Sequence, residues 1–205
     1  MNFPEIITAV KDVLLAIAGA TTATVAVIGL NNWNRELRGK ATFEVARGLA
    51  KATYKLRDEI NGCRSPLVRG TEFPDDYNLA SSRNTAELEA QAYAHMYSKR
   101  WAPVWSALQE FDTHTLEAEA LWSSVIRTKT DEPRKIVQEL TSAIEAVVAN
   151  AASGGEDFST NREFGRKMRS TVAATPGDTK NELTGRLEAA VRGIEDELRP
   201  HLKRG

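Results

Sequence analysis

The feature that most constrains this chain is a long run without charged residues near its N-terminus. Eighteen residues, from Val13 to Leu30, read VLLAIAGATTATVAVIGL and contain no Asp, Glu, Lys or Arg. This is the lower length limit for a helix that crosses the roughly 30 Å hydrocarbon core of a bilayer. The sequence therefore predicts an N-terminal membrane anchor over residues 1–35. Its glycines and threonines make the expected insertion favourable but modest.

The residues on either side of the run predict its orientation. One basic residue, Lys11, precedes it, and seven follow within thirty residues: Arg35, Arg38, Lys40, Arg47, Lys51, Lys55 and Arg57. Because basic residues are retained on the cytoplasmic side, we expect the N-terminus outside and the rest of the chain inside. Trp33 lies where aromatic side chains meet lipid headgroups. The predicted membrane-interface residues are Trp33, Arg35, Arg38 and Lys40.

Two alternatives remain open for this segment. Ala18-Gly19-Ala20 imitates a signal-peptidase site, but the residues before the run are not basic and the run continues past the site. The other alternative is a buried core helix of a soluble protein. Ala16, Ala20 and Thr24 recur every four residues, a spacing that permits close helix–helix contact in lipid and therefore self-association.

The rest of the chain has the periodicity of helices and not of strands. Apolar residues recur at steps of three and four in four segments, which predicts an all-α fold. We expect the anchor to be followed by a cytosolic antiparallel bundle of four or five helices over residues 36–205. The four stripes are Val45, Leu49, Ala52, Leu56 and Ile60; Tyr93, Tyr97, Trp101, Val104, Leu108, Phe111, Thr115, Ala118, Trp122 and Val125; Ile136, Val137, Leu140, Ile144, Val147 and Val148; and Leu183, Leu187, Val191, Ile194, Leu198 and Leu202.

Capping residues and prolines predict where these helices begin and end. Three pairs have the spacing of N-terminal caps: Asn84 with Glu87, Thr160 with Glu163, and Thr179 with Glu182. Pro103 lies inside a stripe and predicts a kink or a break. Pro133 is expected in the first turn of a helix that follows Thr130, where its missing N–H is harmless. Pro200 is expected to distort the end of the last helix.

Residues 62–82 interrupt the helical pattern. Two prolines and a glycine divide this stretch, and several of its side chains are acidic. Some twenty irregular residues is long for a connection within a compact domain. We predict a strap that packs against the bundle, with a functional loop as the alternative.

No motif for catalysis or cofactor binding is present. The chain lacks G-x-S-x-G, a Walker A loop and a G-x-G-x-x-G that opens a helix. Glu110, His114 and Glu117 share a helical face, but a carboxylate-bridged metal site needs Glu-x-x-His on paired helices. Cys63 has no His nearby in sequence to activate it. We therefore expect a non-enzymatic protein with no catalytic, cofactor-binding or metal-binding residues, no cofactor and no small-molecule substrate.

Charge and cysteine content exclude two further classes. The 27 basic residues are balanced by 28 acidic ones, for a net charge of −1, whereas a general nucleic-acid binder is usually basic. The basic residues between 35 and 69 follow the apolar run directly, so anionic headgroups explain them better than nucleic-acid phosphates. We expect a lipid bilayer as partner and no nucleic acid. The single cysteine excludes an internal disulfide.

One stretch resembles a group of bacterial membrane-anchored helical proteins of unknown function. It comprises residues 46–60, ARGLAKATYKLRDEI, the following Arg64-Ser65-Pro66, the anchor and the NWNRELRGK that follows it. The later segments KRWAPV (99–104) and LRPHL (198–202) fit the same resemblance, which covers most of the chain. The resemblance implies a bacterial inner-membrane setting and no activity. It is densest around Arg57, Asp58 and Arg64, which are therefore the candidate interaction residues. The alternative role for these three is a local salt bridge that ties the strap to the bundle.

These observations lead to one hypothesis and two alternatives. We expect a single-pass inner-membrane protein whose cytosolic bundle binds a protein partner or a second copy of itself. The first alternative is a membrane-perturbing effector, such as a phage-related or defence-associated component, whose weak anchor oligomerises. The second is an enzyme at the membrane surface, which requires Arg57, Arg64 and Glu110 to converge on a cleft.

Overall fold

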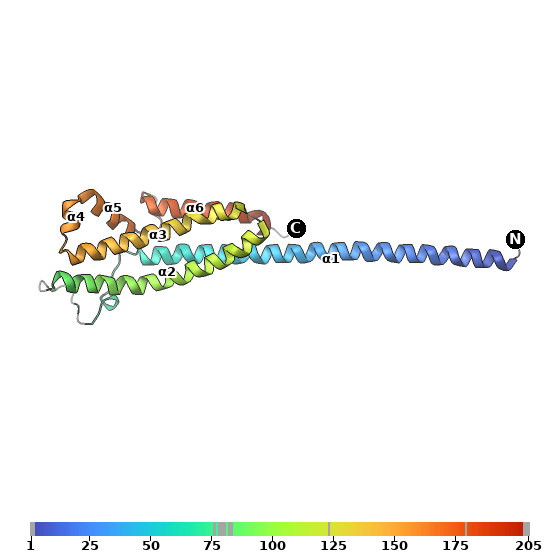
Figure 1. Ribbon diagram of the computed structural model, residues 1–205, viewed down its shortest axis with the longest axis horizontal. Helices are drawn as coiled ribbons and strands as arrows, with labels where there is room; N and C mark the ends of the chain where they lie inside the picture. The colour runs from blue at the N-terminus through green and yellow to red at the C-terminus, as the bar shows by residue number, and fades with distance from the viewer. Residues whose placement is uncertain are drawn as a thin grey trace. The chain divides into compact units, whose positions relative to one another are not determined.

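Helices are the regular secondary structure of the described part of the protein (Figure 1). A computed structural model describes residues 3–75, 77, 81, 84–122, 124–178 and 180–202, without the side chains of residues 3–10, 12, 13, 16 and 124. Its elements are α1 (Phe3–Cys63), the 3-10 turn η1 (Gly70–Glu72), α2 (Ala86–Trp122), α3 (Ser124–Ala152), α4 (Glu156–Thr160), α5 (Arg162–Val172) and α6 (Glu182–Leu202). The described residues form no strand, so the all-α prediction is confirmed.

The chain divides into two compact units, residues 1–44 and residues 45–205. We call them the N-terminal unit and the bundle unit. Helix α1 supplies the described part of the N-terminal unit and, from Val45 to Cys63, the first helix of the bundle unit. The division after Glu44 comes later in the chain than the predicted boundary at residue 35.

The N-terminal unit contains the predicted anchor. Among the residues that the structure describes, no helix is both long enough and apolar enough to cross a membrane. The side chains of Val13 and Ala16, which belong to the uncharged run, lie outside the described set. The predicted transmembrane helix is therefore not identified in the described part of the chain.

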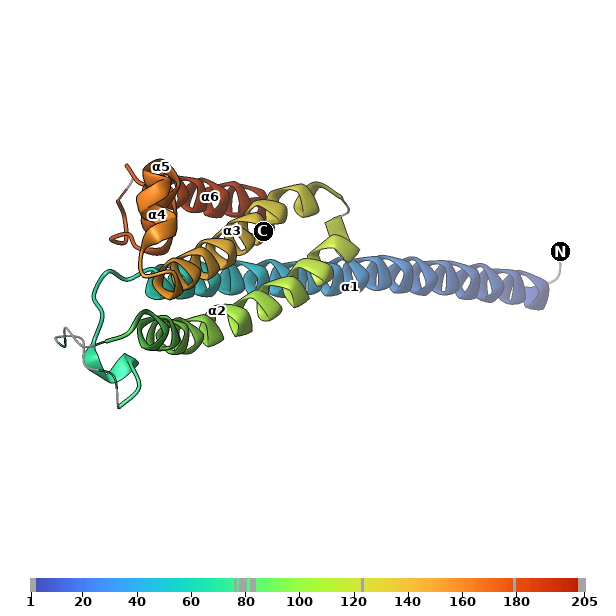
Figure 2. The ribbon, with the colours of Figure 1, turned by 60° about the vertical axis from the view of Figure 1, so that its left-hand side comes forward.

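In the bundle unit, α3 packs against α2, α4, α5 and α6. Figures 1 and 2 show α2 and α3 side by side and running in opposite directions. Helix α1 approaches α2 closely at Gly48, where an added Cβ would lie only 2.7 Å from Nδ1 of His114. A larger residue at position 48 would therefore require the His114 side chain to move.

The predicted apolar stripes form the core of the bundle unit. Buried members from four helices include Leu49, Leu56, Ile60, Val104, Phe111, Ile136, Leu140, Leu187, Ile194 and Leu198. Trp122 stacks on His201, with ring centroids 4.3 Å apart and an interplanar angle of 15°. One member of the stripes is wrong: Val125 is exposed, because α2 ends at Trp122 and the chain has already turned into α3.

Several predicted helix boundaries need correction. Helix α3 begins at Ser124, so Pro133 lies in its interior and not in its first turn. The turns of α3 that precede Pro133 contain Ile126 and Thr130, and their packing buries both residues completely. Helix α2 continues through Pro103, so there is no break at the proline, and α6 ends at Leu202, just after Pro200.

The helix caps lie one or two residues after the predicted ones. The backbone N–H groups of Leu88, Phe164 and Thr184 donate to Thr85 Oγ1 at 3.2 Å, to Asn161 Oδ1 at 3.0 Å and to Asn181 Oδ1 at 3.1 Å. Thr179, one of the predicted caps, lies outside the described residues. Each predicted cap has a second Thr or Asn close by, and spacing alone does not decide between them.

The described part of the strap packs against α2. Phe73 is buried, and its ring lies 5.0 Å from that of Tyr77 and 6.0 Å from that of Tyr93, measured between centroids. Turn η1 also contacts α2. The strap thus adds apolar contacts to the bundle, as the sequence predicts.

Candidate functional site

The N-terminal unit exposes apolar side chains on every side of α1. Leu14, Val25 and Leu30 are 62%, 65% and 61% exposed. The other exposed large apolar residues between positions 14 and 30 are Leu15, Ile17, Val27 and Ile28. Successive side chains on a helix point about 100° apart, so residues at adjacent positions surround the axis and do not form one stripe. A helix that is apolar all round is typical of a protein core or a membrane span.

The threonine hydroxyl groups in this run donate hydrogen bonds to backbone carbonyls of the same helix. Thr21 donates to the carbonyl of Ile17 at 2.9 Å, Thr22 to that of Ala18 at 2.9 Å, and Thr24 to that of Ala20 at 2.8 Å. In a bilayer core there is no water to satisfy polar groups, so they must find partners within the protein. These three hydroxyls have such partners inside their own helix.

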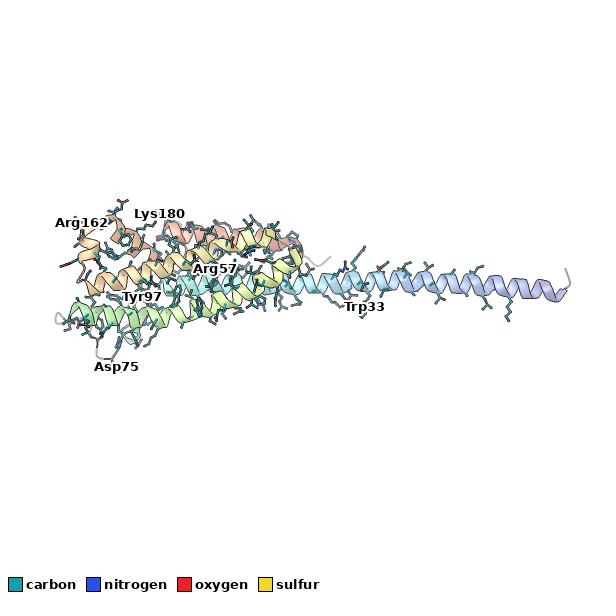
Figure 3. The ribbon with its side chains drawn as sticks, viewed as in Figure 1. Trp33, Arg57, Asp75, Tyr97, Arg162 and Lys180 are labelled. Atoms are coloured by element: carbon teal, nitrogen blue, oxygen red, sulfur yellow. The ribbon has the colours of Figure 1, made fainter. Side chains whose placement is uncertain are left out.

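The predicted membrane-interface residues follow the apolar run directly on α1, and Figure 3 labels the first of them, Trp33. Trp33, Arg35 and Arg38 are exposed. Lys40 is also exposed, and its Nζ lies 2.7 Å from Oε1 of Glu36. An apolar segment with an aromatic residue and cations at its end has the composition of a helix that leaves a bilayer.

Two of the three candidate interaction residues pair with each other on the bundle unit. Arg57 Nε donates to Asp58 Oδ1 at 2.9 Å, and the guanidinium carbon lies 5.2 Å from the ring centroid of Tyr54. Asp58 is exposed, so this ion pair contributes little to stability. Tyr54 in turn lines a cavity of about 290 Å³ between α1 and α6.

The third candidate, Arg64, is completely buried at the end of α1. It donates to the carbonyls of Thr171 at 2.7 Å and Ser170 at 3.3 Å, to Asn181 Oδ1 at 2.8 Å and to Thr184 Oγ1 at 3.0 Å. Burial lowers the pKa of its guanidinium. These bonds join the C-terminus of α5 to the N-terminus of α6. The described partners are neutral oxygens, so Arg64 ties the strap to the bundle without a salt bridge.

A second arginine that the sequence analysis missed holds the strap from the other side. Arg100 of α2 donates to both carboxylate oxygens of Glu72 and to the carbonyls of Ser65 at 2.7 Å and Leu67 at 2.8 Å. The hydrogen bonds from Arg100 lower the pKa of Glu72. The only sign of this contact in the sequence is that Arg100 is basic and the strap is acidic. Such a combination is common on protein surfaces.

The residues required for an enzymatic cleft have separate partners. Glu110 Oε2 accepts from Lys55 Nζ at 2.6 Å, whereas Arg57 pairs with Asp58 and Arg64 is buried. His114 Nδ1 lies 2.9 Å from Glu117 Oε2. Across the residues that the structure describes, no group of His, Cys, Asp and Glu has the arrangement of a metal site. The face that carries Glu110 thus consists of ordinary polar pairs.

Cys63 is not placed for nucleophilic chemistry. Its side chain is buried, and burial raises the pKa of the thiol to about 11. The thiolate is the nucleophilic form, so at neutral pH nearly all of this group is unreactive.

An apolar groove of about 490 Å³ runs between α2 and α3. Its larger lining residues are Tyr97, Trp101, Ile144 and Val148, and most of the others are small. Burial raises the pKa of Tyr97 to about 12. The sequence predicts these aromatic residues as core, and Tyr97 is buried, but Trp101 is only partly covered (Figure 3 labels Tyr97). Helical periodicity predicts that both residues lie on the same side of their helix. It does not show which of them is exposed to solvent.

Comparison with protein-family models, with curated proteins and with solved structures finds no match for this chain.

Proposed function

We propose that this protein is a non-enzymatic, membrane-attached interaction protein. Its uncharged N-terminal segment enters a bilayer in a single pass, and its bundle unit binds a protein partner on the cytoplasmic side. The proposal is carried by the exposed apolar surface of α1 between Leu14 and Leu30. The resemblance that the sequence suggests for residues 32–40, 46–60 and 64–66 is consistent with this setting.

A bilayer would stabilise this segment where water does not. Fully burying one large aliphatic side chain is worth roughly 1.5–3 kcal/mol, and seven such side chains are exposed here. The threonine hydroxyls are already satisfied within the helix, so they add little to the free energy of insertion. Basic residues are concentrated after the segment, which favours a cytoplasmic bundle unit.

Fractionation of cells that express the full chain tests membrane attachment. We expect the protein to stay in the membrane pellet after carbonate extraction, because carbonate removes proteins that are held only by surface charge. A reporter that is active only in the cytoplasm should work at the C-terminus and not at the N-terminus. Release into the soluble fraction, or an active reporter at the N-terminus, would contradict the proposal.

The groove between α2 and α3 supports the second half of the proposal. Helix-binding proteins commonly receive an amphipathic helix in an apolar groove of this kind. A photo-crosslinking amino acid at Ser98, an exposed groove residue, should give one discrete adduct in native membranes. The same probe at Arg192, which is exposed on α6 away from the groove, is the matched control and should give none. No adduct from Ser98, or equal adducts from both positions, would contradict partner binding in the groove.

The effector alternative has less support. It requires anchors to associate through Ala16, Ala20 and Thr24, but the side chain of Ala16 lies outside the described set. The hydroxyl of Thr24 already donates within its own helix. We expect no membrane depolarisation when the protein is highly expressed, and a dye-leakage assay measures this directly.

A further inference from the structure

Three arginines of α5 line a single pocket at one end of the bundle unit. The pocket has a volume of about 520 Å³ and is formed by α5, α4 and the end of α3. Arg162, Arg166 and Arg169 line it together with Asn150 and Ser159. Figure 3 shows Arg162 at this end of the bundle. A volume of this size is typical of pockets for small molecules.

The spacing of the arginines explains why they meet. They occupy positions i, i+4 and i+7 of α5, which lie on one face of a helix. Glu163 and Lys167 also belong to α5, but they lie about 100° further round the axis. Gly165 and Val172, on the buried side of α5, lie roughly 60–90° round the axis from the arginines.

None of the three guanidinium groups is neutralised by a carboxylate among the described residues. The acidic side chains closest in sequence, Glu156, Asp157 and Glu163, do not line the pocket. Elsewhere in the bundle unit, Arg100, Arg134 and Arg186 are each bound by carboxylates on other elements. The pocket therefore concentrates positive charge that the protein itself does not compensate.

The pocket is held in shape by aromatic contacts. The guanidinium carbon of Arg169 lies 5.3 Å from the ring centroid of Phe158, which is buried between α4 and α5. Gly165 permits this arrangement, because a Cβ at that position would lie 2.7 Å from Cβ of Phe158. Asn150 uses its Oδ1 to accept from the Phe158 N–H at 2.8 Å, which leaves its amide N–H groups as donors.

We propose that this pocket binds the phosphoryl group of a small phosphorylated solute. A guanidinium group can form two parallel hydrogen bonds to phosphate oxygens, which makes arginine well suited to phosphate recognition. A phosphate ester carries nearly two negative charges at neutral pH, so it matches several unpaired arginines better than a single carboxylate does. Arg162 and Arg166 supply the main contacts, Arg169 is oriented by Phe158, and Asn150 adds a neutral donor. The inference does not depend on membrane attachment.

Calorimetric titration of the full chain in non-ionic detergent with inorganic pyrophosphate tests the pocket. We expect saturable binding that weakens with added salt. In the double variant Arg162→Gln/Arg166→Gln, binding should weaken about tenfold or more, since a hydrogen bond to a charged group is worth about 1.5–3 kcal/mol. The matched control Arg192→Gln removes an exposed arginine from α6 and should change the affinity by less than about twofold.

Three outcomes would overturn the proposal. One is no saturable binding by the unmodified protein. Another is an equal loss of affinity in Arg192→Gln, which would indicate a diffuse effect of charge. The third is binding of succinate as tight as that of pyrophosphate, which would remove the preference for phosphoryl groups. Circular dichroism of the double variant should be unchanged, because both arginines are exposed.

A second arm separates a solute from a lipid headgroup. The full chain is placed in bilayer discs of phosphatidylcholine or of phosphatidylglycerol, and pyrophosphate is titrated into each. We expect saturable binding in both, with a modestly lower affinity in the anionic discs because of surface charge. Loss of pyrophosphate binding only in the anionic discs would show that headgroups occupy the pocket, and would overturn the solute as its ligand.

Discussion

The two halves of α1 carry the same kinds of side chain in opposite environments. Leu14 and Leu30 in the N-terminal unit are 62% and 61% exposed, whereas Leu49 and Leu56 in the bundle unit are almost completely buried. Leu49 and Leu56 belong to the core cluster of the bundle unit, whereas Leu14 and Leu30 are not among the buried residues that the structure describes. Within its own unit, one part of this chain buries its large aliphatic side chains, and the other leaves Leu14 and Leu30 exposed.

The sequence pattern of each half explains this difference. Between residues 45 and 60 the apolar side chains form one stripe, and Arg47, Lys51 and Lys55 are exposed on the opposite face. Between residues 13 and 30 there is no charged face at all. One-sided burial suits a helix in a bundle, and all-round apolar character is typical of a helix in a protein core or in a bilayer.

The largest expected effect comes from placing charges in the uncharged run. Val25→Arg/Ile28→Arg should make membrane insertion less favourable by roughly 5–7 kcal/mol, since each arginine near the centre of a span is unfavourable by roughly 2.5–3.5 kcal/mol. The protein should move from the membrane pellet to the soluble fraction. Val25→Leu/Ile28→Leu is the matched control and should remain in the pellet. If the arginine variant also stayed in the membrane pellet, the uncharged run would not be the segment that attaches the protein to the membrane.

Leucine-to-alanine substitutions on the two halves of α1 compare the units directly. Leu49→Ala should lower the free energy of unfolding of the bundle by about 2–5 kcal/mol, because it creates a cavity in the core. Leu30→Ala should change it by less than about 0.5 kcal/mol, because this side chain is exposed. Urea unfolding followed by circular dichroism measures both. Similar losses would mean that Leu30 belongs to the same core.

The completely buried Arg64 should matter more than the partly buried Arg57. Arg64→Met removes four hydrogen bonds from oxygens on α5 and α6 and should destabilise the bundle by about 3 kcal/mol. Arg57→Met removes an ion pair to an exposed carboxylate and should have an effect below about 1 kcal/mol. The same unfolding assay compares the two. Equal effects would show that Arg64 is not the residue that joins these helices.

The smallest predicted effect is a pH dependence that involves the strap. Arg100 lowers the pKa of Glu72 in the folded state from its usual value near 4.5. The stability that Glu72 contributes is therefore present above the unfolded-state pKa and is lost as the pH falls through the lower folded-state pKa. Compared with Glu72→Gln, the unmodified protein should be more stable by about 1.5 kcal/mol at pH 7. In acid the difference should disappear, and a constant difference across this range would contradict the pairing.

Much of the fold could be predicted because local periodicity determines which side of each helix is buried. Leu49, Leu140 and Leu187 belong to stripes that are visible in the sequence, and all three are in the core. Boundaries were less predictable. A helix start depends on which of several adjacent Thr or Asn side chains accepts the first N–H, as at Asn161. Helix α3 begins before Pro133, at Ser124, and these N-terminal turns bury Ile126. No local signal in the sequence indicates that burial.

The candidate sites could be predicted only in part. Arg64 binds residues more than one hundred positions away, so no spacing in the sequence points to its role. Arg100 of α2 binds Glu72 of the strap, and no spacing in the sequence points to this pair either. By contrast, the three arginines of the α5 pocket have a visible helical spacing, but only the fold shows that α4 and Asn150 enclose them.

The most direct test of the central claim is the environment of Val25 in a bilayer. A spin label at Val25→Cys, in a Cys63→Ala background, is examined in liposomes by collision with lipid-soluble oxygen and with a water-soluble nickel complex. Leu116→Cys is the matched control, since Leu116 is 66% exposed on α2 and Val25 is 65% exposed on α1. We predict that the label at position 25 collides mainly with oxygen and the label at position 116 mainly with nickel. Equal access of nickel to both positions would contradict membrane attachment through this segment.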